Sequence, residues 1–480
     1  MKFGTSGLRG LVEDLEGRAT SLYTGAFARH LLETGAAGPG SPVLVGRDFR
    51  ASSPGIAATV IGALRRAGLA PLDCGAIPTP ALALYGLKLG AASLMVTGSH
   101  IPDDRNGIKF YRPDGEIDKQ DEARITAIAA ELDGGGGAIE LAPGVAPDRS
   151  AEAAALFAAR NAALLPEGAL AGLRVGVYQH STVARDLLVQ VLEAYGADTV
   201  ALGRSGHFIP VDTEAVPADT VALLKGWAGE HRLDAIVSAD GDGDRPLVTD
   251  ETGEPLRGDL LGLIAARFLG AGVVVTPVTS NSGIEAAGDF QVLRTRVGSP
   301  FVIAGMLEAL QTGQEGQTGQ AADAASTPGG VMGFEANGGL LTGSAFAVAG
   351  GRLDPLPTRD SFLPVLAALF LAAREKTPLS QIAAGFRLPF TAADRLENFP
   401  VEASARLMAH LRASDDNLAA FLAPIAAVAG KSDIDGLRVT LADGRIVHLR
   451  PSGNAPEMRC YVEAQNQLTA KKLLRQGLEL

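Results

Sequence analysis

Short apolar segments alternate with helical stretches along most of the chain, and this alternation limits the possible folds more than any other feature. Strand–helix alternation is typical of α/β domains, in which helices cover a sheet. We therefore predict three successive α/β units. The predicted strands include 42–46, 94–97, 173–178, 198–202, 234–239 and 273–276, and the predicted helices include 54–67, 182–195, 219–232, 259–269, 300–310 and 361–374.

The length and the C-terminal pattern add a fourth domain. One hydrophobic core usually serves up to about 250–300 residues, so a chain of 480 residues divides. Strands at 437–441 and 446–449 flank an Asp443-Gly444 turn, which predicts a β-hairpin. The segments 133–137 and 142–150 read as a linker, and the polar segment 311–330 as a mobile loop. We expect α/β domains at 1–150, 151–256 and 257–376, followed by an α+β domain at 377–480.

The composition excludes several classes of partner. The net charge of −12 argues against a nucleic-acid binder, which usually has a basic surface, but a local arginine cluster can still hold a phosphate. No apolar run is long enough to predict a membrane span, and the N-terminus lacks the apolar core of a secretory signal. The two cysteines lie far apart and outside any CxxC pair, which fits a reducing compartment. We therefore expect a cytoplasmic protein.

The segment Asp240–Arg245, DGDGDR, carries the strongest chemical signal. It follows a predicted strand, and ligands of α/β units collect at the carboxyl ends of strands. Asp240, Asp242 and Asp244 alternate with glycines, so their carboxylates can converge on one hard cation such as Mg²⁺. A solvated acidic turn or a calcium loop would give a similar pattern, although an EF-hand needs further ligands.

Ser99 is the candidate for covalent chemistry. It lies in Thr97-Gly98-Ser99-His100, directly after a predicted strand. Taken alone, this segment is more typical of a polar turn or a helix cap, and a Ser–His–Asp hydrolase would need a GxSxG elbow that is missing. The DGDGDR loop favours Ser99, because a cation there could bind a phosphate carried by the serine. Lys109, close downstream, is either a proton shuttle or an ordinary surface lysine.

Three further segments combine glycines with groups that bind anions or hydroxyls. In GFEANGG, Glu335 and Asn337 could bind sugar hydroxyls, or form a tight loop with a solvated glutamate. In FGTSGLRG, Arg9 is a possible phosphate contact, although the segment is not a P-loop. The segment RPSGN resembles an anion nest, or else a plain hairpin exit. Its candidate phosphate contacts are Arg450, Ser452, Gly453 and Asn454.

In this order, the segments resemble the α-D-phosphohexomutase family. The family pattern has an FGTSGxRG start, a TASHNP serine loop followed by NGxK, then DGDGDR, a GExSG sugar loop and an RPSGTEP phosphate loop. The resemblance spans nearly the whole chain and includes bacterial phosphomannomutases and phosphoglucomutases. The matching segments here are Phe3–Gly10, Thr97–Pro102, Asn106–Lys109, Asp240–Arg245, Glu335–Gly338 and Arg450–Pro456.

The resemblance implies four domains around a central cleft and a reaction that moves phosphate between two hydroxyls of a hexose. It implies that Ser99 is a phosphoserine and that its phosphate oxygen joins Asp240, Asp242 and Asp244 as ligands of Mg²⁺. His100 and Lys109 resemble the acid/base and positioning pair, and Arg245 the arginine near the phosphoserine. Glu335 and Asn337 resemble the residues that bind the sugar hydroxyls. Arg450, Ser452, Gly453 and Asn454 match the site of the non-reacting phosphate.

The expected reaction interconverts a hexose 1-phosphate and 6-phosphate through a hexose 1,6-bisphosphate. Mannose is the preferred sugar, with glucose and N-acetylglucosamine as alternatives, and the protein is expected to be a monomer or a homodimer. The serine loop departs from the pattern at Gly98 and Ile101, and the last loop at Asn454 and Ala455. A sugar-phosphate hydrolase and an inactive sugar-phosphate binding protein are the less favoured alternatives.

Overall fold

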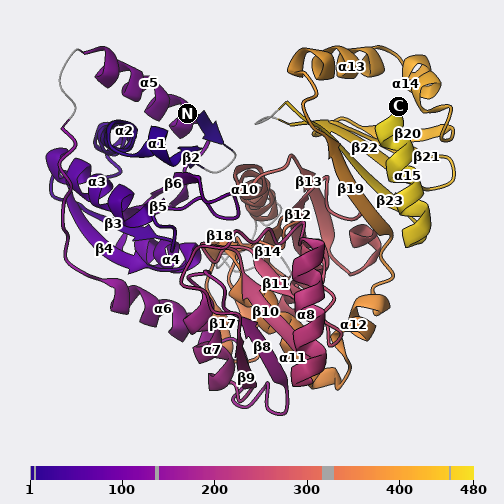
Figure 1. Cartoon of the computed structure of the whole chain (residues 1–480), viewed down its shortest axis with the longest axis horizontal. Helices are drawn as coiled ribbons and strands as arrows, with labels where there is room; N and C mark the ends of the chain where they lie inside the picture. The colour runs from indigo at the N-terminus through magenta and orange to yellow at the C-terminus, as the bar shows by residue number, and fades with distance from the viewer. Residues whose placement is uncertain (1, 5–6, 136–139, 316–328, 453–455) are drawn as a thin grey trace. The chain divides into compact units, whose positions relative to one another are not determined.

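The computed structural model describes residues 2–4, 7–135, 140–315, 329–452 and 456–480 (Figure 1). The chain forms two compact units. The first unit contains Met1–Val274 and Gly298–Ala383, and the second contains Val275–Val297 and Ala384–Leu480. None of the helices in the described residues is long and apolar enough to span a bilayer.

A seven-stranded mixed sheet organises the N-terminal part of the first unit. Its strands run in the order β1-β2-β6-β5-β3-β4, and β7 pairs with β6. β3 is parallel to β4 and β5, whereas β5, β6, β2 and β1 pair antiparallel. The strands are β1 (Lys2–Gly4), β2 (Gly7–Leu11), β3 (Pro42–Arg47), β4 (Ala70–Ala76), β5 (Ala92–Val96), β6 (Arg105–Arg112) and β7 (Gly115–Glu116).

Helices bury both apolar faces of this sheet, which explains why β3 and β5 are nearly continuous runs of apolar residues. Side chains of α2, α3 and α5 share one core with the strands, including Phe27, Ile56 and Ile125. α4 packs against β3 and β5 and also contacts α6. The helices are α1 (Val12–Leu15), α2 (Arg18–Thr34), α3 (Ser53–Arg66), α4 (Thr79–Leu89), α5 (Lys119–Gly134) and α6 (Ser150–Ala162).

A four-stranded sheet follows, in the order β11-β10-β8-β9. β8 pairs parallel with β9 and β10, and β11 returns antiparallel to β10. The loop at Asp240–Arg245 therefore connects two neighbouring strands at the carboxyl end of β10. The elements are β8 (Arg174–Tyr178), α7 (Arg185–Ala194), β9 (Asp198–Leu202), α8 (Ala218–His231), β10 (Ala235–Ala239), β11 (Pro246–Val248) and α9 (Gly258–Leu269).

The rest of the first unit contains three antiparallel strands, β14, β15 and β18, with a hairpin of β16 and β17. The expected loop at 311–330 is wrong at its start, because α10 continues to Glu315, and residues 316–328 lie outside the described residues. The elements are α10 (Ser299–Glu315), β14 (Val331–Phe334), β15 (Leu340–Thr342), β16 (Phe346–Val348), β17 (Gly351–Leu353), β18 (Leu356–Asp360) and α11 (Phe362–Glu375), followed by α12 (Leu379–Gly385) at the boundary.

The second unit is built on a five-stranded antiparallel sheet in the order β19-β23-β22-β21-β20. The predicted hairpin is confirmed: β21 and β22 pair across a turn in which Gly444 has a φ of +82°. The elements are β12 (Val273–Pro277), which begins in the first unit, then η1 (Ser282–Ala286), β13 (Gln291–Thr295), β19 (Phe390–Leu396), α13 (Val401–Ala413), α14 (Asp415–Leu422), β20 (Val428–Ser432), β21 (Leu437–Leu441), β22 (Ile446–Pro451), β23 (Met458–Ala464) and α15 (Gln467–Glu479).

The predicted fold class is confirmed: the chain combines mixed α/β sheets with a C-terminal α+β sheet. The expected linker differs from the structure at both ends, since residues 133–134 belong to α5 and Ser150 begins α6, and also in its second part. Its second part docks on α3, where Gly144 N donates to Ala58 O at 2.8 Å and Arg66 donates to Ala142 O at 2.9 Å. Gly62 allows this approach, because a Cβ there would lie 2.2 Å from Ala142 O.

Candidate active site

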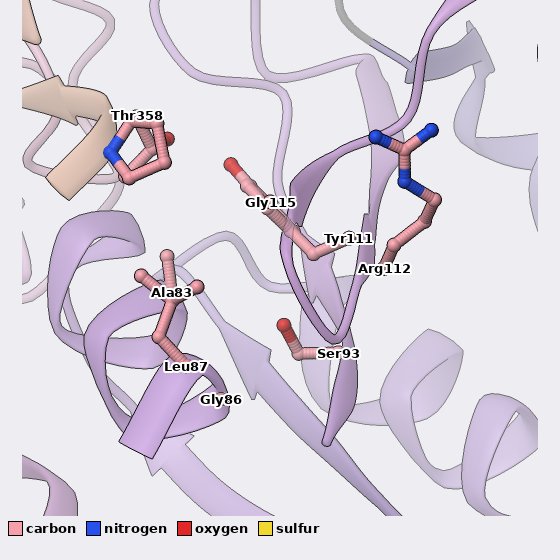
Figure 2. Close-up of a pocket in the computed structure, with 9 residues that line it drawn as sticks. Ala83, Gly86, Leu87, Ser93, Tyr111, Arg112, Gly115 and Thr358 are labelled. Carbon is pink, nitrogen blue, oxygen red and sulfur yellow. The ribbon is translucent and has the colours of Figure 1, made fainter. Parts of the chain in front are cut away.

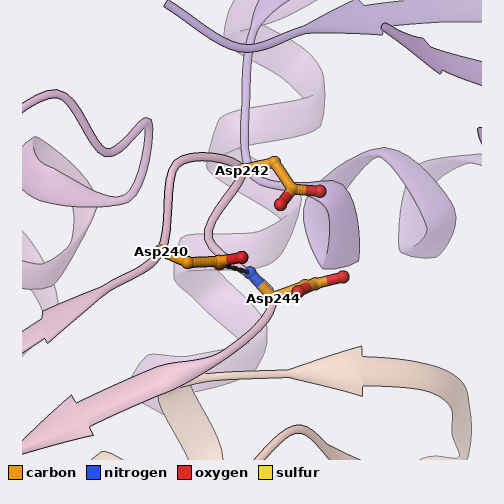
Figure 3. Close-up of side chains that lie close together, drawn as sticks. All are labelled: Asp240, Asp242 and Asp244. Carbon is orange, nitrogen blue, oxygen red and sulfur yellow. Dashed lines mark hydrogen bonds between the residues drawn. The ribbon is translucent and has the colours of Figure 1, made fainter. Parts of the chain in front are cut away.

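The three aspartates of the DGDGDR loop lie together at the end of β10 (Figure 3). Each is almost fully buried, and one carboxylate oxygen from each lies within 4.8 Å of the others. The loop is held from inside, since Asp240 Oδ1 accepts from Asp244 N at 3.1 Å and from Arg245 N at 3.2 Å. The sequence expectation that these carboxylates converge is confirmed.

The donor set fits a small hard cation. Asp242 Oδ1 and Asp244 Oδ1 are buried without a hydrogen-bond partner among the described residues, which is costly unless a cation binds them. Burial, together with Asp242 and Asp244, raises the pKa of Asp240 to about 8. Three crowded carboxylates are stable as anions only when positive charge is brought close, and oxygen ligands are those that Mg²⁺ prefers.

Ser99 faces this loop. Its Oγ donates to Asp240 Oδ2 at 2.5 Å, and its side chain is fully buried. Ser99 follows β5 in the left-handed region, with φ of +53°, a conformation that costs a non-glycine residue energy. Thr97 Oγ1 accepts from Ser99 N at 2.7 Å and stabilises the turn. The structure thus brings the predicted serine and the predicted metal loop together.

Arg50 fixes the backbone around Ser99. Its buried guanidinium donates to the carbonyl oxygens of Ser99 (3.0 Å) and Ile101 (2.7 Å). Two more bonds reach the carbonyls of Pro102 and Arg105, and Asp48 holds the guanidinium at 3.2 Å. One cation therefore holds four carbonyls of the serine loop, which explains how a strained turn persists.

Cationic side chains surround the metal loop. Lys109 Nζ, on β6, donates to Asp242 at 2.6 Å and to Asp244 at 2.5 Å. Arg245 Nη1 lies 2.9 Å from His100 Nδ1, and burial together with Arg245 lowers the pKa of His100 to about 2. Burial, with Arg245 and Arg359, lowers the pKa of Arg9 to about 10, so the guanidinium of Arg9 is still charged at neutral pH. Such a cluster suits a phosphoryl group.

The segment GFEANGG forms a tight loop between β14 and β15. Glu335 N donates to Gly339 O at 3.1 Å, and Gly338 N donates to Glu335 O at 2.9 Å. Both Glu335 and Asn337 are buried, not solvated. Asn337 Oδ1 accepts from Gly339 N at 2.9 Å, which fixes the orientation of its amide.

Arg450 and Ser452 lie in the second unit, at the end of β22. Arg450 Nε lies 3.0 Å from Asp435 Oδ1, and Ser452 N donates to Glu457 O at 2.9 Å. Gly453 and Asn454, the other predicted phosphate contacts, lie outside the described residues.

Sequence reasoning missed several residues that contact the site, among them Arg50, Thr79 and Arg359. Arg50 is described above, and Thr79 Oγ1, at the start of α4, donates to Asp242 Oδ2 at 2.5 Å. Arg359, on β18, forms ion pairs with Asp244 at 2.8 Å and with Glu335 at 2.9 Å. Of these three, only Arg50 could have been found from the sequence. It lies in GRDFRASS, a segment rich in charged and polar residues at the end of a predicted strand, where ligands of α/β units collect.

Sequence models of one protein family match three segments of the chain. Residues 1–134 match "Phosphoglucomutase/phosphomannomutase, alpha/beta/alpha domain I". Residues 257–388 match domain III of the same family, and residues 396–478 match its C-terminal domain.

Known proteins of this family are similar over nearly the full length. A protein named phosphomannomutase from Sinorhizobium fredii is 56% identical over 99% of this chain and 98% of its own length. A phosphomannomutase from Salmonella muenchen is 38% identical over 97% of this chain and 92% of its own length. A crystal structure of a family protein from Burkholderia thailandensis shares the fold, with a TM-score of 0.75, 19% identity, and coverage of 99% of this chain and 96% of that chain. The chain therefore belongs to the phosphoglucomutase/phosphomannomutase family and is an isomerase of the phosphohexomutase type.

Proposed function

We propose that this enzyme is a phosphomannomutase, which interconverts mannose 1-phosphate and mannose 6-phosphate. One observation supports the reaction above all others: Ser99 Oγ lies 2.5 Å from Asp240, beside two buried carboxylate oxygens that accept no hydrogen bond from the described residues. A phosphoryl group on Ser99 would thus lie against a bound cation. The preference for mannose rests on the 56% identical relative named phosphomannomutase. Glucose and glucosamine phosphates are the alternatives.

In the proposed reaction, the phosphoryl group of phosphorylated Ser99 passes to the free hydroxyl of the hexose phosphate. The P–O bond to Ser99 breaks, a P–O bond to the sugar forms, and the proton lost by the sugar hydroxyl is matched by one that Ser99 Oγ gains as the leaving group. The resulting hexose 1,6-bisphosphate reorients and returns its other phosphoryl group to Ser99. A Mg²⁺ held by Asp240, Asp242 and Asp244 would supply charge neutralisation.

The site residues have different roles in the proposed reaction. Phosphoryl transfer depends mainly on positioning and on charge stabilisation. Lys109, Arg245 and Arg9 supply positive charge near the transferred group, and His100, which burial and Arg245 keep neutral by lowering its pKa to about 2, can accept a hydrogen bond. Glu335 and Asn337 would bind the sugar hydroxyls. Arg450, Ser452, Gly453 and Asn454 would bind the phosphate that does not react.

One assay separates this function from its alternatives. The purified protein is incubated with mannose 1-phosphate, Mg²⁺ and a trace of mannose 1,6-bisphosphate. We expect mannose 6-phosphate without release of free phosphate. Inorganic phosphate as the main product would instead indicate a hydrolase, and no turnover of any hexose phosphate would indicate a binding protein. Faster turnover of glucose 1-phosphate or glucosamine 1-phosphate would reassign the sugar.

Ser99→Ala tests the covalent step. We expect turnover to fall by about a thousandfold or more, because the phosphoryl carrier is lost. The intact wild-type protein should carry a phosphate that mass spectrometry locates on Ser99 and that is absent from the variant. Near-normal turnover in a correctly folded Ser99→Ala protein would contradict the mechanism.

Two expectations stay predictions. They are the oligomeric state and the division into domains at 1–150, 151–256, 257–376 and 377–480.

A further inference from the structure

The junction between β18 and α11 is anchored by four consecutive residues, Thr358–Ser361. Each bonds to a segment distant in the sequence, and Arg359 and Ser361 both bond to the DGDGDR loop. β18 also lies against the N-terminal sheet, where Thr358 and residues of α4, β5 and β6 line a cavity of about 10 Å³ (Figure 2). The bonds are Thr358 Oγ1 to Glu116 (2.8 Å), Arg359 to Asp244 and Glu335, Asp360 to Arg160 (3.1 Å), and Ser361 Oγ to Gly243 O (2.7 Å).

Within this junction, Arg359 bridges the metal loop and the Glu335 loop. Its Nε and Nη2 lie 3.0 and 2.8 Å from Asp244 Oδ2, and its Nη1 lies 2.9 Å from Glu335 Oε2. The side chain is 3% exposed. Gly339 makes room for it, because a Cβ at position 339 would lie 2.5 Å from Arg359 Cδ.

Because Asp244 and Glu335 share one guanidinium, the electrostatic interaction of each carboxylate with Arg359 depends on the other. Burial would raise the pKa of Asp244, but Arg359 and Lys109 hold it well below its usual range. Because all three side chains are buried, a change in the charge of one carboxylate alters how strongly the guanidinium binds the other. A fork-shaped guanidinium can contact both at once, which a single ammonium group does less well.

We propose that Arg359 is a positioning residue that couples cation binding at the DGDGDR loop to how firmly Glu335 is held. This inference rests on the proposed function, in which Glu335 binds the sugar hydroxyls. Arg359 contacts Asp244 and Glu335 at the same time, so the two carboxylates share its positive charge. When a cation takes over Asp244, that charge acts on Glu335 alone and holds it more firmly for the sugar. When Glu335 draws on that charge, Arg359 competes less strongly with the cation for Asp244. By linkage, each event favours the other by the same factor.

A double-mutant cycle on cation binding tests this coupling without any sugar. The affinity for Mn²⁺, used as a spectroscopic probe of the Mg²⁺ site, is measured by electron paramagnetic resonance on the full chain. We expect Glu335→Gln to weaken Mn²⁺ binding by about three- to tenfold, because a released Arg359 binds Asp244 more fully. In the Arg359→Met background, the same change should alter the affinity by less than about twofold.

Control variants separate coupling from general damage. Glu116→Gln removes a carboxylate that acts on Arg359 only through space and bonds to Thr358 instead, so it should change Mn²⁺ affinity by less than about twofold. Arg359→Lys keeps the charge and serves if Arg359→Met fails to fold; it should also shrink the effect of Glu335→Gln. Circular dichroism and thermal unfolding verify the fold of each protein.

An equal effect of Glu335→Gln with and without Arg359 would show direct electrostatics and overturn the proposal. No effect in either background would overturn it as well. Because no sugar is present, these outcomes are independent of the mutase assay. Failure of that assay with the cycle intact would reject the proposed function and leave the coupling of the two loops standing.

Discussion

Gly98 lies directly before Ser99, and the guanidinium of Arg50 occupies the space that a side chain at position 98 would need. A Cβ there would lie 2.6 Å from Arg50 Cζ. The family pattern places alanine at this position. Here glycine replaces it, and the missing side chain leaves room for the guanidinium of Arg50. Arg50 also lies over the ring of Phe208, at 3.9 Å from the centroid, which limits how far it can move away.

We therefore expect Gly98→Ala to be damaging although alanine is common in the family. Overpacking of a close-packed site costs about 1–3 kcal/mol, and the strain would fall on the loop that holds Ser99. Turnover and the melting temperature should both fall. Gly55→Ala is the matched control, since nothing lies within 4 Å of a Cβ at that exposed position in α3. Equal activity and stability of the two variants would contradict this account of the serine loop.

Residues with chemistry inside one short segment could be predicted from the sequence. Ser99, Asp240 and Lys109 lie in loops or strands whose spacing and order carried the prediction, and the structure brings them together. Arg359 could not be found this way, because its contacts with Asp244 and Glu335 depend on how three distant segments fold. The alternative reading of the DGDGDR loop as a solvated acidic turn does not fit, because its three aspartates are buried.

At the scale of elements, continuous apolar strands were the most predictable feature. β10, a buried and largely apolar run, was predicted within one residue, and β9, which begins with Asp198 and Thr199, was predicted at its observed bounds. α5 was missed, although Ile125 and Ile128 lie on its buried side and Asp118 precedes it as a cap. The glycines at the end of α5 favoured the prediction of a linker there. In the same way, α10 continues to Glu315, within the segment predicted to be a loop.

Asp118 begins α5 with a capping box. Its side chain accepts from Gln120 N at 2.8 Å and Asp121 N at 2.9 Å, and Asp121 accepts from Asp118 N in return. Asp118→Ala should cost about 1 kcal/mol, because the first-turn amides lose their acceptor. Asp118→Ser retains an acceptor and should lose less. Hydrogen exchange of the first turn of α5 measures the effect, and equal protection in both variants would argue against the cap.

At the scale of the whole molecule, the fold class followed from the pattern of strands and helices, whereas the division into units did not. Val275–Val297 belongs to the second unit although the flanking residues belong to the first. No local composition marks such a return of the chain, because compact units are defined by contacts between segments that are distant in sequence. The stability of each unit therefore has to be measured separately.

The pH dependence of the second unit follows from His448. Its Nε2 lies 2.6 Å from Asp435 O, and burial lowers its pKa to about 4. In the unfolded chain the pKa of a histidine is about 6.5. Above that pH, His448 is neutral in both the folded and the unfolded chain, so its protonation does not reduce the free energy of unfolding. As the pH falls from about 6.5 toward 4, the unfolded state takes up the proton first. Stability is therefore lost over this window, by up to about 2 kcal/mol at pH 5 for this group.

His448→Gln keeps a hydrogen-bond donor but removes the titration. We expect the free energy of unfolding of the second unit to fall less between pH 7 and pH 5 in the variant than in the wild type. Urea unfolding can be followed in each unit through labelling of its buried cysteine, Cys460 in the second unit and Cys74 in the first, with a thiol reagent active at both pH values. Cys74 is the internal control, because the substitution should leave the pH dependence of its exposure unchanged. If Cys460 showed the same pH dependence in both proteins, the buried neutral His448 would not be what destabilises this unit in acid.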